Sequence, residues 1–177
     1  MTPLRVAAAA AILFAATQVR AEVQDVKEGA FTTRSVILVD LPPAAAYRAL
    51  TQLPSWWDPA HTWSGSARNL TLDPKAGGCF CEKLAGGGSV QHARVVFAQP
   101  AKLLRLEGAL GPLQDMAVTG VLTFALAPDG PGTRITLTYR VSGVFSMDSA
   151  KLAPGVDQVL HGQFERLRGY ANSRARR

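Results

Sequence analysis

The chain has 177 residues, with 19 Lys and Arg against 13 Asp and Glu, yet this net charge of +6 does not predict a nucleic-acid-binding protein. Three arginines belong to a predicted solvated basic tail at 173–177, and Arg5 and Arg20 belong to an N-terminal segment that we expect to be removed. The remaining body is close to neutral, with no basic stripe and no alternation of basic and aromatic residues.

Residues 1–21 have the pattern of a secretory signal peptide. Arg5 supplies a positive charge, the 11 residues of 6–16 are apolar but too few to span a bilayer, and Ala21 offers a small residue for cleavage. An uncleaved anchor or an Ala-rich helix is the alternative. We therefore expect an exported, periplasmic or extracellular protein from a bacterium, with one domain of ordinary size and no stable membrane insertion after cleavage.

The first elements of the mature chain are short. Residues 22–30 are predicted to be a flexible polar leader, and 34–41 are β-branched and apolar, which indicates a strand. Pro42 and Pro43 then open a short helix, because proline is tolerated in a first helical turn. Pro54 ends that helix, and a second short helix or turn follows at 55–59.

Six further strands follow, separated by glycine and proline. In the last of them apolar and polar residues alternate, with Ile135, Leu137, Tyr139 and Val141 on one face. A period of two with short turns predicts an antiparallel meander that is half exposed to water. The predicted strands are 69–72, 79–84, 90–98, 103–107, 117–126 and 133–141.

The C-terminal segment has a helical period. Its apolar residues recur every three or four positions, which predicts an amphipathic helix of about 17 residues after Pro154. The order of elements indicates an α+β fold: a curved antiparallel sheet wrapped around a long C-terminal helix, with two short helices after the first strand. A helix lying across the concave face would leave a gap between the two layers.

The order of several motifs resembles the SRPBCC superfamily, which includes START-like and birch-pollen-allergen-like proteins, and in particular its heat-shock-ATPase-activator-like or polyketide-cyclase-like branch. The resemblance implies a single helix-grip domain over residues 31–172. It also implies a cavity, since members bind lipids, sterols and polyketides and some are cyclases or hydrolases. It implies no particular chemistry, because the superfamily shares no catalytic motif. The motifs are Leu41-Pro42-Pro43, Trp56-Trp57, Gly77-Gly78-Cys79-Phe80, Pro100 before Leu103-Leu104, and 132–137 before the terminal helix.

Large aromatic residues gather in the irregular segment after the first helix. Trp56, Trp57 and Trp63 lie where no periodicity requires them, so we predict that they line or cover a ligand cavity. The alternative is that they close the end of the core. His61 lies between them, as a surface-loop residue or a further ligand contact.

The hairpin around Gly87 carries the candidate polar pair. Pairing about this glycine would place Glu82 opposite His92, on one face with Phe80 and Arg94. If that face points inward, the pair could perform acid/base chemistry or hold a polar ligand group; the alternative is an exposed ion pair of little energetic value. The opposite face is more apolar, which favours it as core: Cys79, Cys81, Ala93, Val95 and Phe97.

Cys79 and Cys81 are expected to be free thiols, or to form a disulfide only after local distortion. Residues two apart in a strand are about 6.5–7 Å apart and their side chains are parallel, at the edge of the range for a disulfide. A Cys-x-Cys pair with His92 also lacks the spacing of a zinc site, so no metal and no cofactor are predicted.

Gln114, after a Gly-Pro turn, and Tyr139 complete the predicted ligand-binding set. The leading hypothesis is an exported protein that binds a small lipid-like or aromatic molecule in a hydrophobic, Trp-lined cavity. One alternative is a cyclase, dehydratase or hydrolase that uses Glu82 and His92. A second is a module that interacts with a chaperone.

Overall fold

The computed structural model describes residues 22–176, so the signal-peptide prediction lies outside the described residues. The sheet contains eight strands in the order β1-β2-β8-β7-β6-β5-β4-β3, and each neighbouring pair is antiparallel. The strands are β1 (Glu22–Lys27), β2 (Ala30–Val39), β3 (Leu70–Leu72), β4 (Cys79–Lys83), β5 (Ser89–Gln99), β6 (Leu103–Glu107), β7 (Ala117–Asp129) and β8 (Gly132–Val144). The helices are α1 (Pro43–Thr51) and α2 (Ser149–Ala175), and the short 3-10 turns are η1 (Leu53–Ser55), η2 (Pro59–His61), η3 (Ala67–Asn69), η4 (Ala85–Gly87) and η5 (Gly111–Asp115).

The predicted flexible leader is wrong for most of its length, because residues 22–27 form the edge strand β1. Gly29 adopts a positive φ of 72° and turns the chain back, so that β1 pairs with the start of β2. The segment is mostly polar and exposed, so its composition does not indicate a strand. It is a strand because its backbone pairs with β2.

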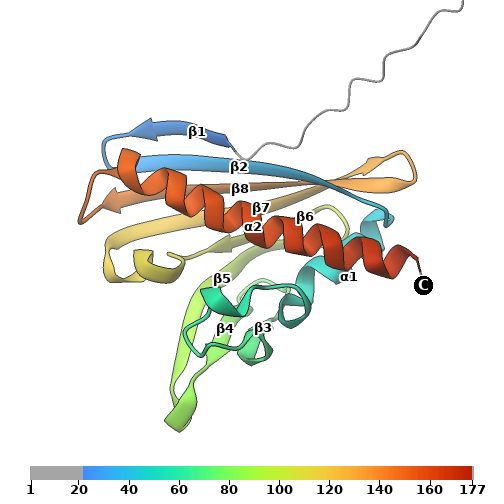
Figure 1. Ribbon diagram of the computed structural model, residues 1–177, viewed down its shortest axis with the longest axis horizontal. Helices are drawn as coiled ribbons and strands as arrows, with labels where there is room; N and C mark the ends of the chain where they lie inside the picture. Colours follow the sequence, from blue (N-terminus) through green and yellow to red (C-terminus); the bar gives the residue numbers. More distant parts are fainter. Residues whose placement is uncertain (1–21, 177) are drawn as a thin grey trace, which may run out of the picture.

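The inward face of the sheet supplies much of the core. The predicted alternation in β8 is confirmed, since Ile135, Leu137, Tyr139 and Val141 are all buried. Strands β3 to β5 turn steeply away from β1, β2 and β8, which makes the sheet strongly curved (Figure 1). Helix α2 lies across this curve and contacts β1, β2 and α1.

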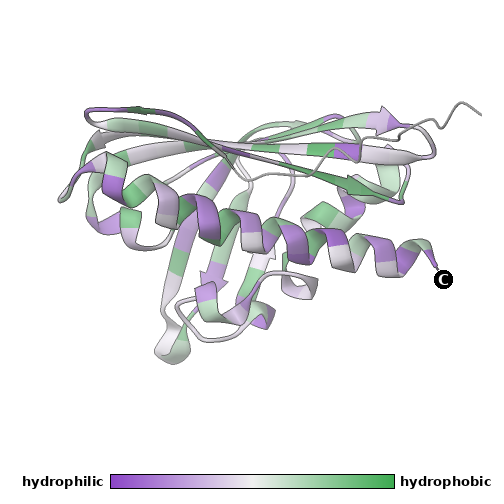
Figure 2. Ribbon diagram, turned by 45° about the horizontal axis from the view of Figure 1, so that its top comes forward, coloured by the Kyte–Doolittle hydropathy of each residue, from purple (hydrophilic) through white to green (hydrophobic). Residues whose placement is uncertain are grey.

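Helix α2 is longer than predicted, with 27 residues. It begins before Pro154 because the Asp148 carboxylate accepts a hydrogen bond from the Ala150 amide at 2.9 Å and caps the first turn. Pro154 removes one backbone hydrogen bond near the start without ending the helix. The helix continues to Ala175, so most of the predicted basic tail is helical. Polar and apolar residues alternate along it (Figure 2).

The predicted α+β helix-grip class is confirmed: a curved antiparallel sheet, a long C-terminal helix and short helical segments between β2 and β3. In the described part of the chain, neither helix has the length and apolar character needed to cross a membrane. Residues of the segment between η1 and η3, of the η5 turn and of α2 line one common cavity.

Candidate functional site

A cavity of about 540 Å³ lies between the first half of α2, the curved sheet and the two loops. Its wall is mostly apolar and aromatic, as small-molecule sites generally are. Among its lining residues, all within the described chain, none is Lys, Arg, Asp or Glu. The lining residues are Trp57, Ala60, His61, Thr62, Trp63, Phe80, His92, Leu110, Gly111, Pro112, Leu113, Tyr139, Leu152, Gly155, Val156, Val159 and Leu160.

His92 reaches this cavity through an irregularity in the β4–β5 ladder. Phe80 pairs with Ala93, but the next residue, Cys81, pairs with Gln91, so His92 is the extra residue of a β-bulge in β5. Its side chain and that of Ala93 are both buried although the two residues are adjacent. The bulge therefore breaks the alternation of faces and turns His92 inward.

Glu82 meets His92 at the back of the cavity wall. The predicted register is wrong, because Glu82 pairs with Val90 rather than with His92. The bulge nevertheless brings the two side chains together, with 2.9 Å between Nε2 of His92 and Oε2 of Glu82. Only 1% of Glu82 and 6% of His92 are exposed, so the pair is not the exposed ion pair of the alternative interpretation. Arg94 is exposed, contrary to the prediction that it shares this face.

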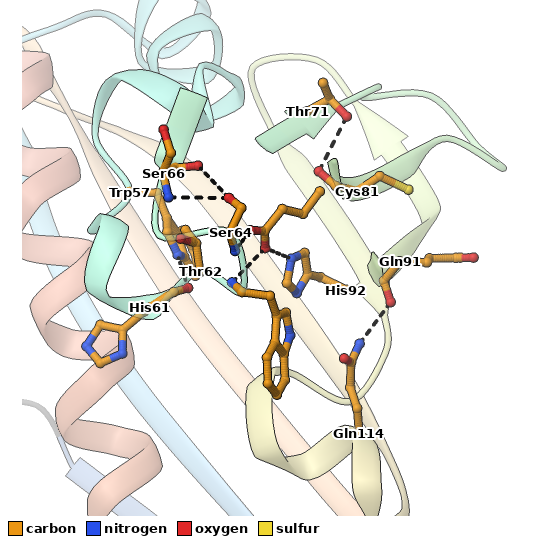
Figure 3. A network of polar contacts seen from close by, with 12 residues as sticks. Trp57, His61, Thr62, Ser64, Ser66, Thr71, Cys81, Gln91, His92 and Gln114 are labelled. Atoms are coloured by element: carbon orange, nitrogen blue, oxygen red, sulfur yellow. Dashed lines mark hydrogen bonds and ion pairs between the residues drawn. The ribbon is translucent and has the colours of Figure 1, made fainter. Parts of the chain in front are cut away.

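The Glu82 carboxylate also holds the loop that covers the cavity. It accepts hydrogen bonds from the backbone N–H groups of Trp63, at 3.1 Å, and Ser64, at 2.5 Å (Figure 3). Burial alone would raise the pKa of the Glu82 carboxyl, but the hydrogen bonds from Ser64, Trp63 and His92 together hold this pKa below its ordinary value. Glu82 is thus an ionised acceptor shared by the loop and the imidazole.

An ionised carboxylate fixes the role of each His92 nitrogen. A carboxylate can only accept hydrogen bonds, so Nε2 of His92 must be the donor to Glu82. The other nitrogen, Nδ1, forms no hydrogen bond within the described residues. His92 lines the cavity, and Nδ1 is the polar atom of its side chain that the protein leaves unbonded. It accepts a hydrogen bond when the ring is neutral and donates one when the ring is charged.

Two of the three tryptophans line the cavity. Trp57 is 9% exposed, and its Nε1 donates to the His61 carbonyl at 2.9 Å, which closes the loop over the cavity. Its ring also contacts Phe80, with 5.4 Å between ring centroids. Trp63 is 52% exposed at the mouth. Trp56 is instead part of the core and does not line the cavity, because its Nε1 is bound to the Leu50 carbonyl at 3.1 Å.

His61 lines the cavity from the loop, but it does not join the polar pair. Its side chain is exposed and points away from His92 (Figure 3). Gln114 does not line the cavity either. Its Nε2 donates to the Gln91 carbonyl at 2.9 Å, which ties η5 to β5 beside the bulge. Of these two predicted ligand-binding residues, His61 can contact a ligand, whereas Gln114 positions a loop.

Tyr139 lines the cavity with its ring, while its hydroxyl is fully used. The hydroxyl donates to the Gly108 carbonyl at 3.0 Å and accepts from the Leu110 amide at 3.1 Å. Burial raises the pKa of this phenol, and the Leu110 hydrogen bond lowers it only in part. Gly120 leaves room for the ring, since a Cβ there would overlap it. Tyr139 thus fixes the loop before η5 and has no free polar atom for a ligand.

The sequence interpretation missed several apolar walls of the cavity. Phe80 lies between the two cysteines and contacts the His92 ring, with 4.8 Å between ring centroids. Phe80 could have been identified from the sequence, because it was predicted to share a strand face with Glu82. The contributions of η5 and of the start of α2 have no local signal, because they depend on how α2 crosses the sheet. The main missed residues are Phe80, Leu110, Leu113, Leu152, Val156 and Leu160.

Cys79 and Cys81 form a disulfide, so the prediction of free thiols is wrong and its alternative, a bridge after local distortion, applies. Their Cα atoms are 5.4 Å apart, closer than the spacing of a regular strand. Both are half-buried on the outer face of β4, while Phe80 and Glu82 face inward, so the predicted core face is wrong for the cysteines. Of its β5 members, Ala93 and Val95 are buried as predicted, whereas Phe97 is exposed. In residues 22–176 no group of His, Cys, Asp and Glu could hold a metal ion.

Comparisons with known proteins agree with this architecture. The model of the family described as polyketide cyclase / dehydrase and lipid transport matches residues 30–172. The crystal structure of MLL2253 from Mesorhizobium loti is 25% identical, with a TM-score of 0.56, covering 78% of this chain and 95% of that chain. The solution structure of a protein from Arthrobacter aurescens is 15% identical, with a TM-score of 0.59 and coverages of 88% and 92%. Ara h 8.0201 is 14% identical, with a TM-score of 0.59 and coverages of 82% and 99%. No curated protein matches the chain.

Proposed function

We propose that this chain, which belongs to the polyketide cyclase / dehydrase and lipid transport family, binds a small hydrophobic molecule between α2 and the sheet. The family is of the SRPBCC type, as the sequence motifs predict. The observation that carries this proposal is the cavity itself, about 540 Å³ of mostly apolar space with aromatic walls. A volume of this size suits a molecule of a few fused rings or a short lipid.

The cavity wall also limits the charge of the ligand. None of the described lining residues is Lys or Arg, so a carboxylate or phosphate group would find no permanently charged partner there. The buried His92 side chain instead carries one polar atom that the protein leaves unbonded, Nδ1. A hydroxyl group can either donate to a neutral imidazole or accept from a charged one, so it satisfies Nδ1 in both states. The preferred ligand is therefore a neutral hydrophobic molecule with one hydroxyl group.

A blocked cavity tests the binding function. Val156 lines the cavity from α2, whereas Gln158 on the same helix is exposed. In Val156→Trp the indole should occupy the ligand space, and binding of phenanthrene, followed by its fluorescence, should weaken at least tenfold. Gln158→Trp introduces the same side chain outside the cavity and should bind as the unmodified protein does. Equal binding by both variants would exclude the cavity as the site.

A second candidate function is proton transfer to or from a bound substrate. It is favoured by the 2.9 Å contact between His92 and Glu82, which orients the imidazole as a general base is oriented. The chemistry would be removal of a proton from carbon or oxygen by Nδ1, as a dehydratase or cyclase requires. The test is exchange of the α-hydrogens of tetralone with deuterium in D₂O. Catalysed exchange that His92→Gln abolishes would favour the enzyme, and no exchange with retained binding would favour the carrier.

Export of the protein remains part of the proposal. It is supported by the signal pattern of residues 1–21 and by the disulfide, which persists best in an oxidising compartment. N-terminal sequencing of the protein recovered from the periplasm or medium of its source should give Glu22 as the first residue. Recovery of the intact chain from the cytosol would contradict export.

A further inference from the structure

The disulfide and the bulge lie at the same point of the β4–β5 ladder. The change of register falls between Phe80 and Cys81 on β4, within the segment that the Cys79–Cys81 bond closes. On β5 the residue left over at this point is His92. The covalent bond on the outer face of β4 is thus directly across the ladder from the residue that supplies the polar atom of the cavity.

His92 would face outward in a regular ladder. Val95 and Ala93 are buried and Arg94 is exposed, so strict alternation along β5 would place Gln91 inward and His92 outward. The bulge reverses this order, because His92 is buried and Gln91 is exposed. The inward position of His92, and with it the contact to Glu82, therefore depends on the extra residue in β5.

The disulfide shortens the opposite strand where the extra residue occurs. The Cα atoms of Cys79 and Cys81 are 5.4 Å apart, against about 6.6 Å for two residues of an extended strand. The disulfide thus fixes the conformation of β4 at the step where β5 accommodates its extra residue. We propose that the Cys79–Cys81 disulfide is a redox-reversible positioning element, which holds the bulge and thereby directs His92 into the ligand cavity.

Reduction would release this constraint. A thiolate of an external dithiol attacks one cysteine sulfur to form a mixed disulfide and expel the other cysteine thiolate, and the second thiol of the reagent then displaces the first cysteine. Two electrons and two protons pass to the protein, the reagent leaves as a cyclic disulfide, and Cys79 and Cys81 each become a thiol. Both sulfurs belong to half-buried residues on the outer face, which a reagent can reach without entering the cavity.

The consequence for the site is a change of specificity rather than a loss of the cavity. With β4 free to extend, the ladder can take a regular register, and a shift of one residue moves a side chain to the opposite face. His92 would then leave Glu82 and the cavity, whose apolar walls on α2, η5 and β8 would persist. Resting on the proposed function, this predicts that the protein loses its preference for a hydroxyl-bearing ligand when the disulfide is absent.

Imidazole NMR tests the proposal without any ligand. The chain has three histidines, so His92 can be assigned in the ¹⁵N-labelled protein with a His92→Gln variant. In the oxidised protein the Nε2–H of His92 should give a slowly exchanging signal, because it donates to the buried Glu82 carboxylate. This signal should disappear after reduction and in Cys79→Ser/Cys81→Ser. Amide signals of β7 and β8 that stay in place would show that the sheet is still folded.

Ligand selectivity provides the second measurement. In the oxidised protein a phenanthrol should bind about tenfold more tightly than its methyl ether, because the ether cannot donate to Nδ1. In the reduced protein and the double Ser variant this ratio should fall to within about twofold, while phenanthrene binds as before. An unchanged His92 signal and an unchanged ratio after reduction would overturn the proposal. Failure of phenanthrene to bind in either state would instead reject the binding function, and the NMR result would still decide the role of the disulfide.

Discussion

Nε2 of His92 lies 2.9 Å from Oε2 of Glu82, although the two residues are not paired across the β4–β5 ladder. Their contact joins three parts of the molecule, because the same carboxylate binds the backbone of the loop at Trp63 and Ser64. Loop, hairpin and cavity wall are therefore connected through one buried charge. A change at Glu82 should affect the covering loop and the imidazole together.

Glu82→Gln should destabilise the protein by about 2 kcal/mol. The amide keeps the shape of the side chain, but its oxygen is a weaker acceptor for Trp63 and Ser64, and hydrogen bonds to a charged group contribute about 1.5–3 kcal/mol. Urea unfolding followed by circular dichroism would measure the change. Glu107→Gln is the matched control on β6, since Glu107 faces exposed Arg94 at 3.7 Å, and it should cost less than about 1 kcal/mol. Equal effects of the two substitutions would contradict the role assigned to Glu82.

Acid should remove the contribution of Glu82 to stability. Its folded pKa lies below the ordinary value of 4.5, so folding is favoured by the ionised form. This stabilisation is fully present above the pKa of the unfolded chain, near 4.5, and is lost as the pH falls through the lower folded pKa. Thermal unfolding across this range should show a steeper loss of Tm in the unmodified protein than in Glu82→Gln. Parallel curves would mean that the Glu82 carboxyl has the same pKa in both states.

The scaffold follows from patterns that neighbouring residues carry. Apolar side chains recur at every second position in β8 and at every third or fourth in α2, so burial on one face is evident from local spacing alone. Strand β1 has no such pattern, because its place is set by pairing with β2. The start of α2 was predicted too late, after Pro154. The helix begins earlier because Asp148 caps its first turn, and the proline six residues later does not interrupt it.

The candidate site depends on contacts that local spacing does not specify. The proximity of Glu82 and His92 was predicted with the wrong register, and the bulge that restores the contact leaves no mark in the residues of β5. Trp56 and Trp57 are adjacent and chemically equal, yet only Trp57 reaches the cavity, since the turn after η1 decides which indole faces it. The Glu82 carboxylate accepts hydrogen bonds from the backbone N–H groups of Trp63 and Ser64, which are distant in sequence. Every residue except proline has such an N–H group, so the sequence does not identify these partners.

Tyr139→Phe should loosen the loop before η5 without disturbing the core. The substitution leaves the Gly108 carbonyl and the Leu110 amide without the partner they share, which costs about 1–3 kcal/mol. Faster hydrogen exchange at Leu110, with unchanged exchange in β2, would confirm a local effect. Tyr170→Phe is the control, because the Tyr170 hydroxyl only accepts a 3.4 Å contact from Arg174 at the surface. Protection at Leu110 that survives Tyr139→Phe would show that the phenol does not hold the loop.

Trp57 and Trp63 should separate stability from binding. Trp57 is 9% exposed and packs on Phe80, so Trp57→Ala leaves a hole in the core and should cost about 3–5 kcal/mol. Trp63 is 52% exposed at the mouth of the cavity, so Trp63→Ala should change stability by no more than about 0.5 kcal/mol. It removes an aromatic surface from the ligand, however, and should weaken phenanthrene binding by roughly fivefold, as expected for about 1 kcal/mol of ring contact. Denaturant titration and fluorescence binding on the same samples measure both quantities. Trp63→Ala that binds phenanthrene normally would place the ligand deeper, away from the mouth.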